Sequence, residues 1–170
     1  MTGSFGIEAM SSDYDRSSFS CGNPALDRYL REQATQDMKR LISSCFVLID
    51  KRSQRVAGYY TLAATSVLAE DLPADTLKKL PRYPVLPAAL VGRLAVDLAY
   101  KRRGLGGVLL ADAALRITNG DVRAFAIVVD AKDDDAAAFY RAQGFLPLAS
   151  RPMSLFLPLA TFRKASSGKA

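Results

Sequence analysis

A strand-like segment that runs into a glycine- and arginine-rich turn, and then into a helix, is the feature that most constrains this chain. Residues 94–100 read Leu-Ala-Val-Asp-Leu-Ala-Tyr, residues 101–107 read Lys-Arg-Arg-Gly-Leu-Gly-Gly, and an apolar helical pattern follows. Glycine lets the backbone approach a ligand closely, and the first N–H groups of a helix have no partner within the helix. Because these groups lie at the positive end of the helix dipole, they favour phosphate binding. The segment therefore predicts a site for a phosphorylated cofactor.

Three interpretations of the turn at residues 101–107 compete on local grounds. A P-loop is excluded because no GxxxxGK[ST] is present. A Rossmann turn fits poorly, since Gly104, Gly106 and Gly107 do not have GxGxxG spacing and they follow a hairpin rather than a first strand. A glycine-rich helix entry that binds no ligand is the third interpretation, and the local sequence leaves it open.

Residue types that are missing from the chain limit its chemistry. There is no histidine, which excludes Ser-His and Cys-His nucleophilic mechanisms, and Cys21 and Cys45 lack CxxC spacing, so we expect no metal site. We find no secretory signal and no apolar run of the roughly 18 residues that a membrane span needs, so we expect a cytoplasmic protein without a membrane partner. The net charge of +6 fits an anionic partner, although it could serve solubility alone.

Apolar periodicity and turn residues predict one domain over residues 1–162 and a flexible basic tail over 163–170. Asn23-Pro24 begins a helix that reaches about Arg40, and Asp133-Asp134-Asp135 precede a helix that Gly144 ends. Shorter helices are expected at 70–80 and from 104 to about 119. Strands are expected at 5–9, 45–50, 56–64, 91–97, 124–129, 145–148 and 153–157. This order predicts an α/β (α+β) fold, with a sheet covered by helices.

A second motif lies about 35 residues after the turn, where residues 138–145 read Ala-Phe-Tyr-Arg-Ala-Gln-Gly-Phe. Together with the turn it resembles the GNAT (Gcn5-related) N-acetyltransferases, whose motifs are [Q/R]xxGx[G/A] at a helix start and a later xFYxxxGF helix. The resemblance implies the GNAT fold, a central mixed β-sheet flanked by helices, and acetyl-CoA as cofactor. Lys101 departs from the family, which has Gln or Arg there.

The resemblance also implies roles for particular residues. The pyrophosphate of acetyl-CoA would lie on the N–H groups of the turn, and its pantetheine arm would pair with the backbone of the preceding strand. Tyr140 would be the general acid for the departing thiolate; its alternative is an aromatic residue packed in the core. The implied cofactor-binding residues are Leu94, Ala95, Val96, Lys101, Arg102, Arg103, Gly104, Leu105, Gly106, Gly107 and Val108.

Further segments are similar to the GNAT-type toxins of bacterial toxin–antitoxin pairs, namely residues 19–30, 58–63 and 92–97. Members of that group acetylate the α-amino group of aminoacyl-tRNA, which blocks translation, and an antitoxin that is usually of ribbon-helix-helix type neutralises them. They are often dimeric, so a homodimer is open for this chain. Two alternatives remain: a GNAT enzyme for a protein N-terminus, polyamine or small-molecule amine, and a non-enzymatic module that binds nucleic acid.

If the substrate is a tRNA, basic side chains of this chain could contact its phosphates. Arg93 is the strongest candidate since it lies on the expected cofactor strand; for each of the others an ordinary solvated position is as good an explanation. The full set is Arg28, Arg31, Lys39, Arg40, Lys78, Lys79, Arg82 and Arg93.

Overall fold

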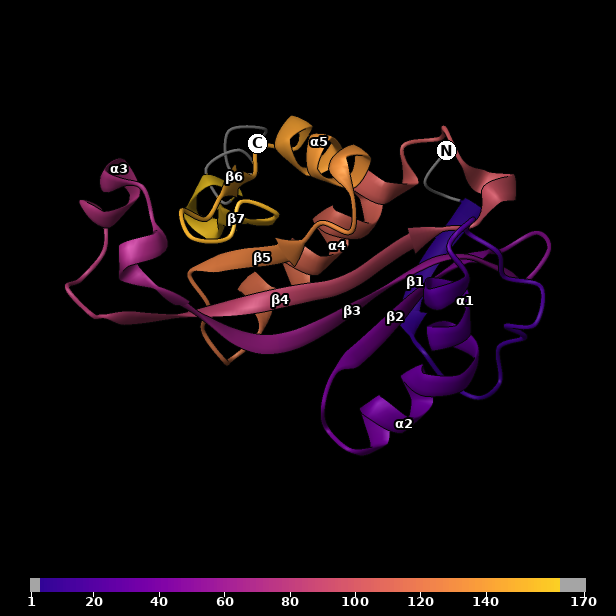
Figure 1. The fold of residues 1–170 in the computed structure, drawn as a ribbon. Coiled ribbons are helices and arrows are strands. Elements are labelled where there is room, and N and C mark those ends of the chain that lie inside the picture. The colour runs from indigo at the N-terminus through magenta and orange to yellow at the C-terminus, as the bar shows by residue number, and fades with distance from the viewer. Residues whose placement is uncertain (1–3, 163–170) are drawn as a thin grey trace. The chain divides into compact units, whose positions relative to one another are not determined.

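A computed structural model describes residues 4–162 and shows a seven-stranded sheet with helices packed against it (Figure 1). The strands are β1 (Phe5–Ala9), β2 (Ser44–Asp50), β3 (Arg55–Leu68), β4 (Val85–Val96), β5 (Ala126–Asp130), β6 (Leu146–Pro147) and β7 (Ser154–Pro158). The helical elements are α1 (Pro24–Arg28), the π-helical turn η2 (Tyr29–Gln33), α2 (Ala34–Lys39), η3 (Ala69–Asp71), α3 (Ala74–Leu77), η4 (Leu98–Tyr100), α4 (Leu105–Asn119) and α5 (Asp134–Ala142). No helix within residues 4–162 is both long and apolar enough to cross a membrane.

The sheet is mixed, and its strand order is β1-β2-β3-β4-β5-β7-β6. β4 and β5 run parallel, with Ala88–Val91 opposite Ala126–Val129, whereas the β1–β2, β2–β3, β5–β7 and β6–β7 pairs are antiparallel. The continuous apolar run of β5 is buried over residues 126–129, as expected for a strand covered on both faces. The expected mixed α/β sheet is confirmed.

The helix expected from Asn23 is present and contains a turn that the sequence did not reveal. The Asn23 side chain accepts hydrogen bonds from the N–H groups of Ala25 and Leu26, which caps the helix as predicted. The chain then widens into the π-helical turn Tyr29–Gln33 before α2 completes the segment. Leu30 and Ala34 are fully buried against the sheet core. A π-helical turn of this kind is frequently found at functional sites.

Three expected boundaries differ clearly from the structure, and one of them is the end of β3, which lies at Leu68 instead of residue 64. β4 begins at Val85 instead of residue 91, because the Pro87 carbonyl accepts the Phe125 N–H and the ladder with β5 starts immediately after it. The helix expected at 70–80 is split into the 3-10 turn η3 and the one-turn helix α3. Pro73 separates them, with an extended backbone that cannot continue a helix.

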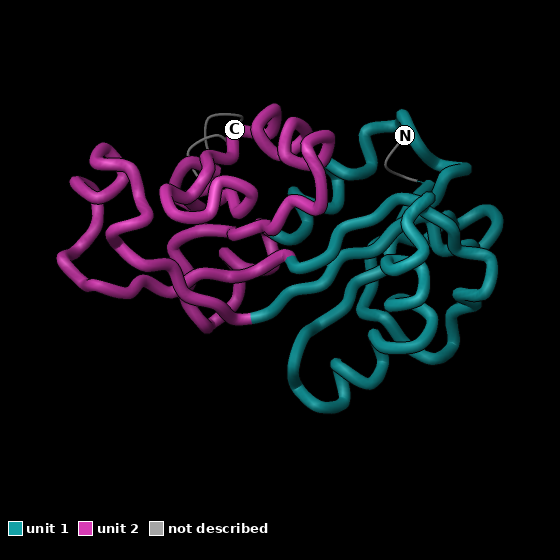
Figure 2. Tube along the Cα trace, in the orientation of Figure 1, with its two compact units in different colours: residues 1–63, 92–113 teal, residues 64–91, 114–170 magenta. Residues whose placement is uncertain are grey.

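The chain forms two compact units, which Figure 2 colours separately. Unit 1 comprises residues 1–63 and 92–113, and its core gathers residues such as Leu30, Val47 and Tyr59 between the helical segment and β2–β3. Unit 2 comprises residues 64–91 and 114–170, with a separate core that includes Val67, Leu148 and Phe156. The expected single domain stays a prediction, and the expected basic tail at 163–170 lies outside the described residues.

Candidate functional site

The end of β4 offers backbone groups that its neighbour β5 does not use. The β4–β5 ladder ends at the pair Val91–Val129, five residues before β4 itself ends at Val96. Ala95 is buried, whereas Leu94 and Val96 are half-buried. The N–H and C=O groups along that edge of Leu94–Val96 are therefore placed to pair with an extended ligand, as in the addition of a strand to a sheet.

The turn between β4 and α4 has a backbone suited to an anion. Arg102 and Gly104 both adopt left-handed conformations, with φ of 65° and 73°. Such residues turn successive N–H groups toward one concave side. The first bond of α4 runs from the Val108 N–H to the Gly104 carbonyl, at 3.3 Å, so the preceding N–H groups of its first turn have no partner within the helix. A Cβ on Gly104 would meet nothing within 4 Å, which leaves open space on that face for a ligand.

Asp97 fixes the start of this turn, and the sequence analysis did not single it out. Asp97 is only 3% exposed, and its carboxylate accepts hydrogen bonds from the N–H of Ser20 at 3.0 Å and of Ala99 at 2.9 Å. Arg55 lies 3.8 Å from the same carboxylate. An aspartate between a strand and a turn is a common capping signal, but only the structure shows that it also binds the distant Ser20.

Tyr140 belongs to unit 2, on α5, which begins at the three aspartates as predicted and whose N-terminus is capped by Asp133. The ring is buried, with Phe139 and Phe145 at centroid distances of 5.3 and 5.5 Å. Burial, aided by the negative charge of Asp130, raises the pKa of the Tyr140 phenol to about 12. The phenol therefore keeps its proton at neutral pH, and the described residues provide no hydrogen-bond acceptor for it.

The basic residues expected to contact RNA fall into both units. Seven are exposed: Arg28, Arg31, Lys39 and Arg40 in unit 1, and Lys78, Lys79 and Arg82 in unit 2. Arg93 differs because it is half-buried and its guanidinium carbon lies 3.5 Å from the centroid of the Tyr29 ring. The structure thus gives Arg93 a defined position.

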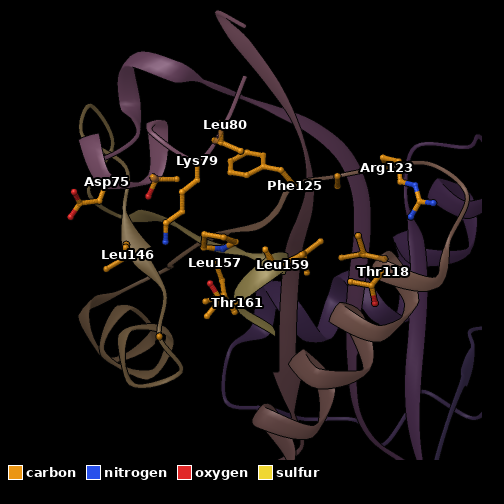
Figure 3. A pocket seen from close by; sticks show the side chains of 16 residues that line it. Asp75, Lys79, Leu80, Thr118, Arg123, Phe125, Leu146, Leu157, Leu159 and Thr161 are labelled. Atoms are coloured by element: carbon orange, nitrogen blue, oxygen red, sulfur yellow. The ribbon is translucent and has the colours of Figure 1, made fainter. Parts of the chain in front are cut away.

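Unit 2 also holds a cavity of about 720 Å³ that sequence reasoning did not predict. Figure 3 shows apolar side chains, among them Leu80, Phe125 and Leu159, between Lys79 and Arg123. Neither Tyr140 nor any residue of the β4–α4 turn lines it, and Lys79 is the one predicted site residue that does. The cavity is therefore distinct from the residues expected to bind the cofactor.

Comparison with known proteins identifies relatives of this chain. Residues 87–154 match the acetyltransferase (GNAT) domain. A protein of Mycobacterium tuberculosis named tRNA-acetylating toxin is 41% identical over 145 residues, which are 84% of this chain and 85% of the relative. A protein of Sinorhizobium fredii named probable toxin TacT is 30% identical over 159 residues, 88% of each chain.

Solved structures agree with these sequence matches. A mutant of KacT has a TM-score of 0.88 at 27% identity, over 95% of this chain and 99% of its own. AtaT complexed with acetyl-methionyl-tRNAfMet has a TM-score of 0.87 at 28% identity, covering 95% and 98%. A mutant AtaT toxin bound to the C-terminus of the antitoxin AtaR and to acetyl-CoA has a TM-score of 0.75 at 25% identity, covering 93% and 95%. With a 41% identical relative matched over most of its length, this chain belongs to the GNAT family of acetyltransferases.

Proposed function

We propose that this protein is a toxin that transfers the acetyl group of acetyl-CoA to the α-amino group of an aminoacyl-tRNA and so blocks translation. The observation that carries the proposal is the sequence of three elements: the end of β4 that β5 does not pair with, the left-handed turn, and α4. They occur in a chain that is 41% identical to a tRNA-acetylating toxin. The AtaT structure with acetyl-methionyl-tRNAfMet supports the same choice of acceptor.

The residues of unit 1 fit acetyl-CoA as the acetyl donor. The N–H groups of the turn, from Arg102 into the first turn of α4, would hold the pyrophosphate, and Lys101 and Arg103 would add positive charge around it. The backbone of Leu94–Val96 would pair with the pantetheine arm. When bound, acetyl-CoA supplies a thioester carbonyl that an amine can attack.

An aminoacyl-tRNA suits a chain without histidine. The attacking amine must be neutral, and an α-amino group has a pKa of about 8, compared with about 10.4 for lysine. A substantial fraction of the α-amine is therefore neutral between pH 7 and 8 without a protein base. Because the α-amine has a lower pKa than a lysine side chain, the reaction needs no histidine as a base, and this sequence has no histidine.

Tyr140 is proposed as the catalytic donor to the leaving thiolate. Because its pKa is raised to about 12, the phenol is protonated throughout the neutral range, and no described residue competes for its hydrogen bond. The Tyr140 hydroxyl would give its proton to the departing sulfur, and the resulting phenolate would take up the proton that the new amide nitrogen releases, so that the thiol leaves neutral and the phenol is restored.

Replacement of Tyr140 by phenylalanine tests this role. The ring contacts with Phe139 and Phe145 remain, so the Y140F variant should fold and bind acetyl-CoA as the wild type does. We expect acetylation of charged tRNA to fall by about 10²- to 10⁴-fold, the usual contribution of a positioned acid. Mass spectrometry of charged tRNA and growth arrest on expression measure the effect. An unchanged rate in Y140F contradicts the role of Tyr140, and a wild type that acetylates other amines but not charged tRNA contradicts the proposed acceptor.

The proposal extends to partners and location. A cognate antitoxin, of ribbon-helix-helix type, neutralises the protein; the AtaT–AtaR structure supports an antitoxin as partner. In this proposal the exposed arginines and lysines of both units contact tRNA. The protein acts in the cytoplasm, and it forms a homodimer. Co-expression with the cognate antitoxin should restore growth, and light scattering measures the oligomeric state.

A further inference from the structure

Arg93 is held in place at both its backbone and its side chain. Its N–H donates to the hydroxyl of Thr61 at 3.1 Å, and Thr61 is only 2% exposed. Its guanidinium lies over the Tyr29 ring with the carbon 3.5 Å from the ring centroid. Stacking of this kind orients a guanidinium while leaving its N–H groups free to bind in the plane.

The side-chain donors of Arg93 are not used by the described part of the chain. Three other arginines of unit 1 do have acceptors: Arg16 donates to the Leu30 carbonyl at 2.9 Å, Arg31 donates to the Phe19 carbonyl at 3.3 Å, and Arg55 lies beside Asp97. Among residues 4–162, no side-chain hydrogen bond or ion pair engages the Arg93 guanidinium. Five N–H donors in a rigid fork are therefore available, in the geometry that matches a phosphate.

Tyr29 is itself locked as a platform for this arginine. It stands at the start of the π-helical turn, and its hydroxyl donates to Asp37 at 2.8 Å and lies 3.3 Å from the Ser43 hydroxyl. Hydrogen bonds from Gln33 and Tyr29 lower the pKa of Asp37, so this acceptor stays ionised. The Tyr29 ring also stacks on that of the fully buried Tyr59, at a centroid distance of 6.3 Å.

The position of Arg93 along β4 indicates what it would bind. In the proposed function the pyrophosphate would lie on the turn that follows β4 and the arm along Leu94–Val96, so the acetyl end of the arm would lie toward Arg93. The acceptor amine must reach that end. In an aminoacyl-tRNA, the amino acid is an ester of the terminal ribose, and the nearest negative charge is the phosphate that precedes this ribose.

We infer that Arg93, oriented by Tyr29, binds a phosphate at the 3′ end of the aminoacyl-tRNA and thereby places the α-amine at the acetyl group. Arg93 is the contacting residue, and Tyr29 is a positioning residue that acts through it. The inference rests on the proposed function and specifies how the acceptor is recognised: by its backbone charge, and not by the amino acid alone.

The test compares two acceptors that share the aminoacyl ester: charged tRNA, and the corresponding 3′-O-aminoacyl-adenosine, which has no phosphate. For R93Q we expect KM for charged tRNA to rise by about tenfold or more, the loss typical of a charge-assisted hydrogen bond. The rate with aminoacyl-adenosine should not change. Loss of one contact to a single strand should also reduce the slope of log affinity against log salt by about 0.7.

R52Q is the matched control, because Arg52 is exposed on the β2–β3 turn and removal of this arginine changes the net charge equally. Y29F keeps the ring, so its KM for charged tRNA should stay close to that of the wild type. Y29L removes the stack, so its KM should rise to that of R93Q. Acetyl-CoA affinity by calorimetry and the melting temperature establish that each variant is folded.

Two results would overturn the inference while the proposed function stands. In the first, the wild type acetylates charged tRNA, but the slope of log affinity against log salt is the same for R93Q as for R52Q. The other is an equal loss in R93Q with charged tRNA and with aminoacyl-adenosine, which would indicate a structural role. A wild type that acetylates neither acceptor refutes the proposed function, and the inference with it.

Discussion

Gly58 allows β3 to approach β4 at the strand end proposed to hold the pantetheine arm, so Gly58→Ala should damage stability and cofactor binding together. An added Cβ would lie 2.9 Å from the Ala95 carbonyl oxygen and 3.3 Å from a methyl carbon of Leu109. Side chains essentially never come this close to a backbone oxygen, and the oxygen belongs to a paired strand. The Ala95 backbone must therefore move.

The magnitude follows from two opposing terms. Overpacking of a dense core costs about 1–3 kcal/mol. Replacing glycine by alanine within a strand recovers about 0.5–1 kcal/mol of chain entropy. The difference spans about 0–2.5 kcal/mol, and because the clash is with a backbone oxygen we expect the upper half, about 1–2.5 kcal/mol, which for a chain of 170 residues lowers Tm by roughly 2–10 °C.

Urea unfolding and calorimetric titration with acetyl-CoA measure the two effects, and Gly6→Ala provides the control. A Cβ on Gly6, which also lies in a strand, would meet the Cε atom of Lys51 at 3.2 Å, the far end of a flexible side chain that can move aside. That variant should be as stable as the wild type or slightly more stable. A Gly58→Ala protein with the stability of Gly6→Ala and unchanged acetyl-CoA affinity would refute the reasoning.

Two further predictions concern buried groups of unit 1. Asp97→Asn leaves the Ser20 or Ala99 N–H opposite an amide donor, so we expect a loss of roughly 1–3 kcal/mol and weaker acetyl-CoA binding by calorimetry. Arg55→Gln removes the half-exposed ion pair and the contact of Arg55 with the Tyr100 ring but leaves both N–H bonds intact, so it should cost under about 1 kcal/mol. Equal effects of the two substitutions would contradict the role of the N–H groups. Burial raises the pKa of Cys45 from 9.0 to about 12, so the unfolded chain ionises first as pH rises and stability falls. Relative to Cys45→Ala, the wild type should lose about 1 kcal/mol of unfolding free energy between pH 9 and 10, and parallel pH profiles would exclude this contribution.

Signals confined to a few neighbouring residues predicted the local structure well. Asn23 and Asp133 cap helices through their own side chains, and Gly144 ends α5 with a φ of 98°. Each of these depends on atoms within about four residues, which the sequence presents directly. The glycine turn also appeared where expected, because Gly104 adopts the left-handed conformation for which glycine is favoured.

Features that depend on distant partners did not follow from local patterns. β4 starts six residues earlier than expected because its length is set by hydrogen bonds such as that from Phe125 to Pro87. The change from α-helix to π-helix at Tyr29 likewise could not be predicted, because the apolar pattern of the sequence is helical on both sides of it. Pro87 is predicted to lie in a loop, but it belongs to β4, where its carbonyl accepts a hydrogen bond from the Phe125 N–H next to β5.

The sequence by itself determined the order of the elements, the place of the glycine turn and the family resemblance, because periodicity, caps and motifs are local. Only the tertiary structure decided that Asp97 reaches Ser20, that Gly58 lies against Ala95, and that Arg93 rests on Tyr29, 64 positions earlier in the chain. These contacts require the register of a strand against its neighbours and the placement of a helix over the sheet. Both are fixed by packing of the whole core and not by any single segment.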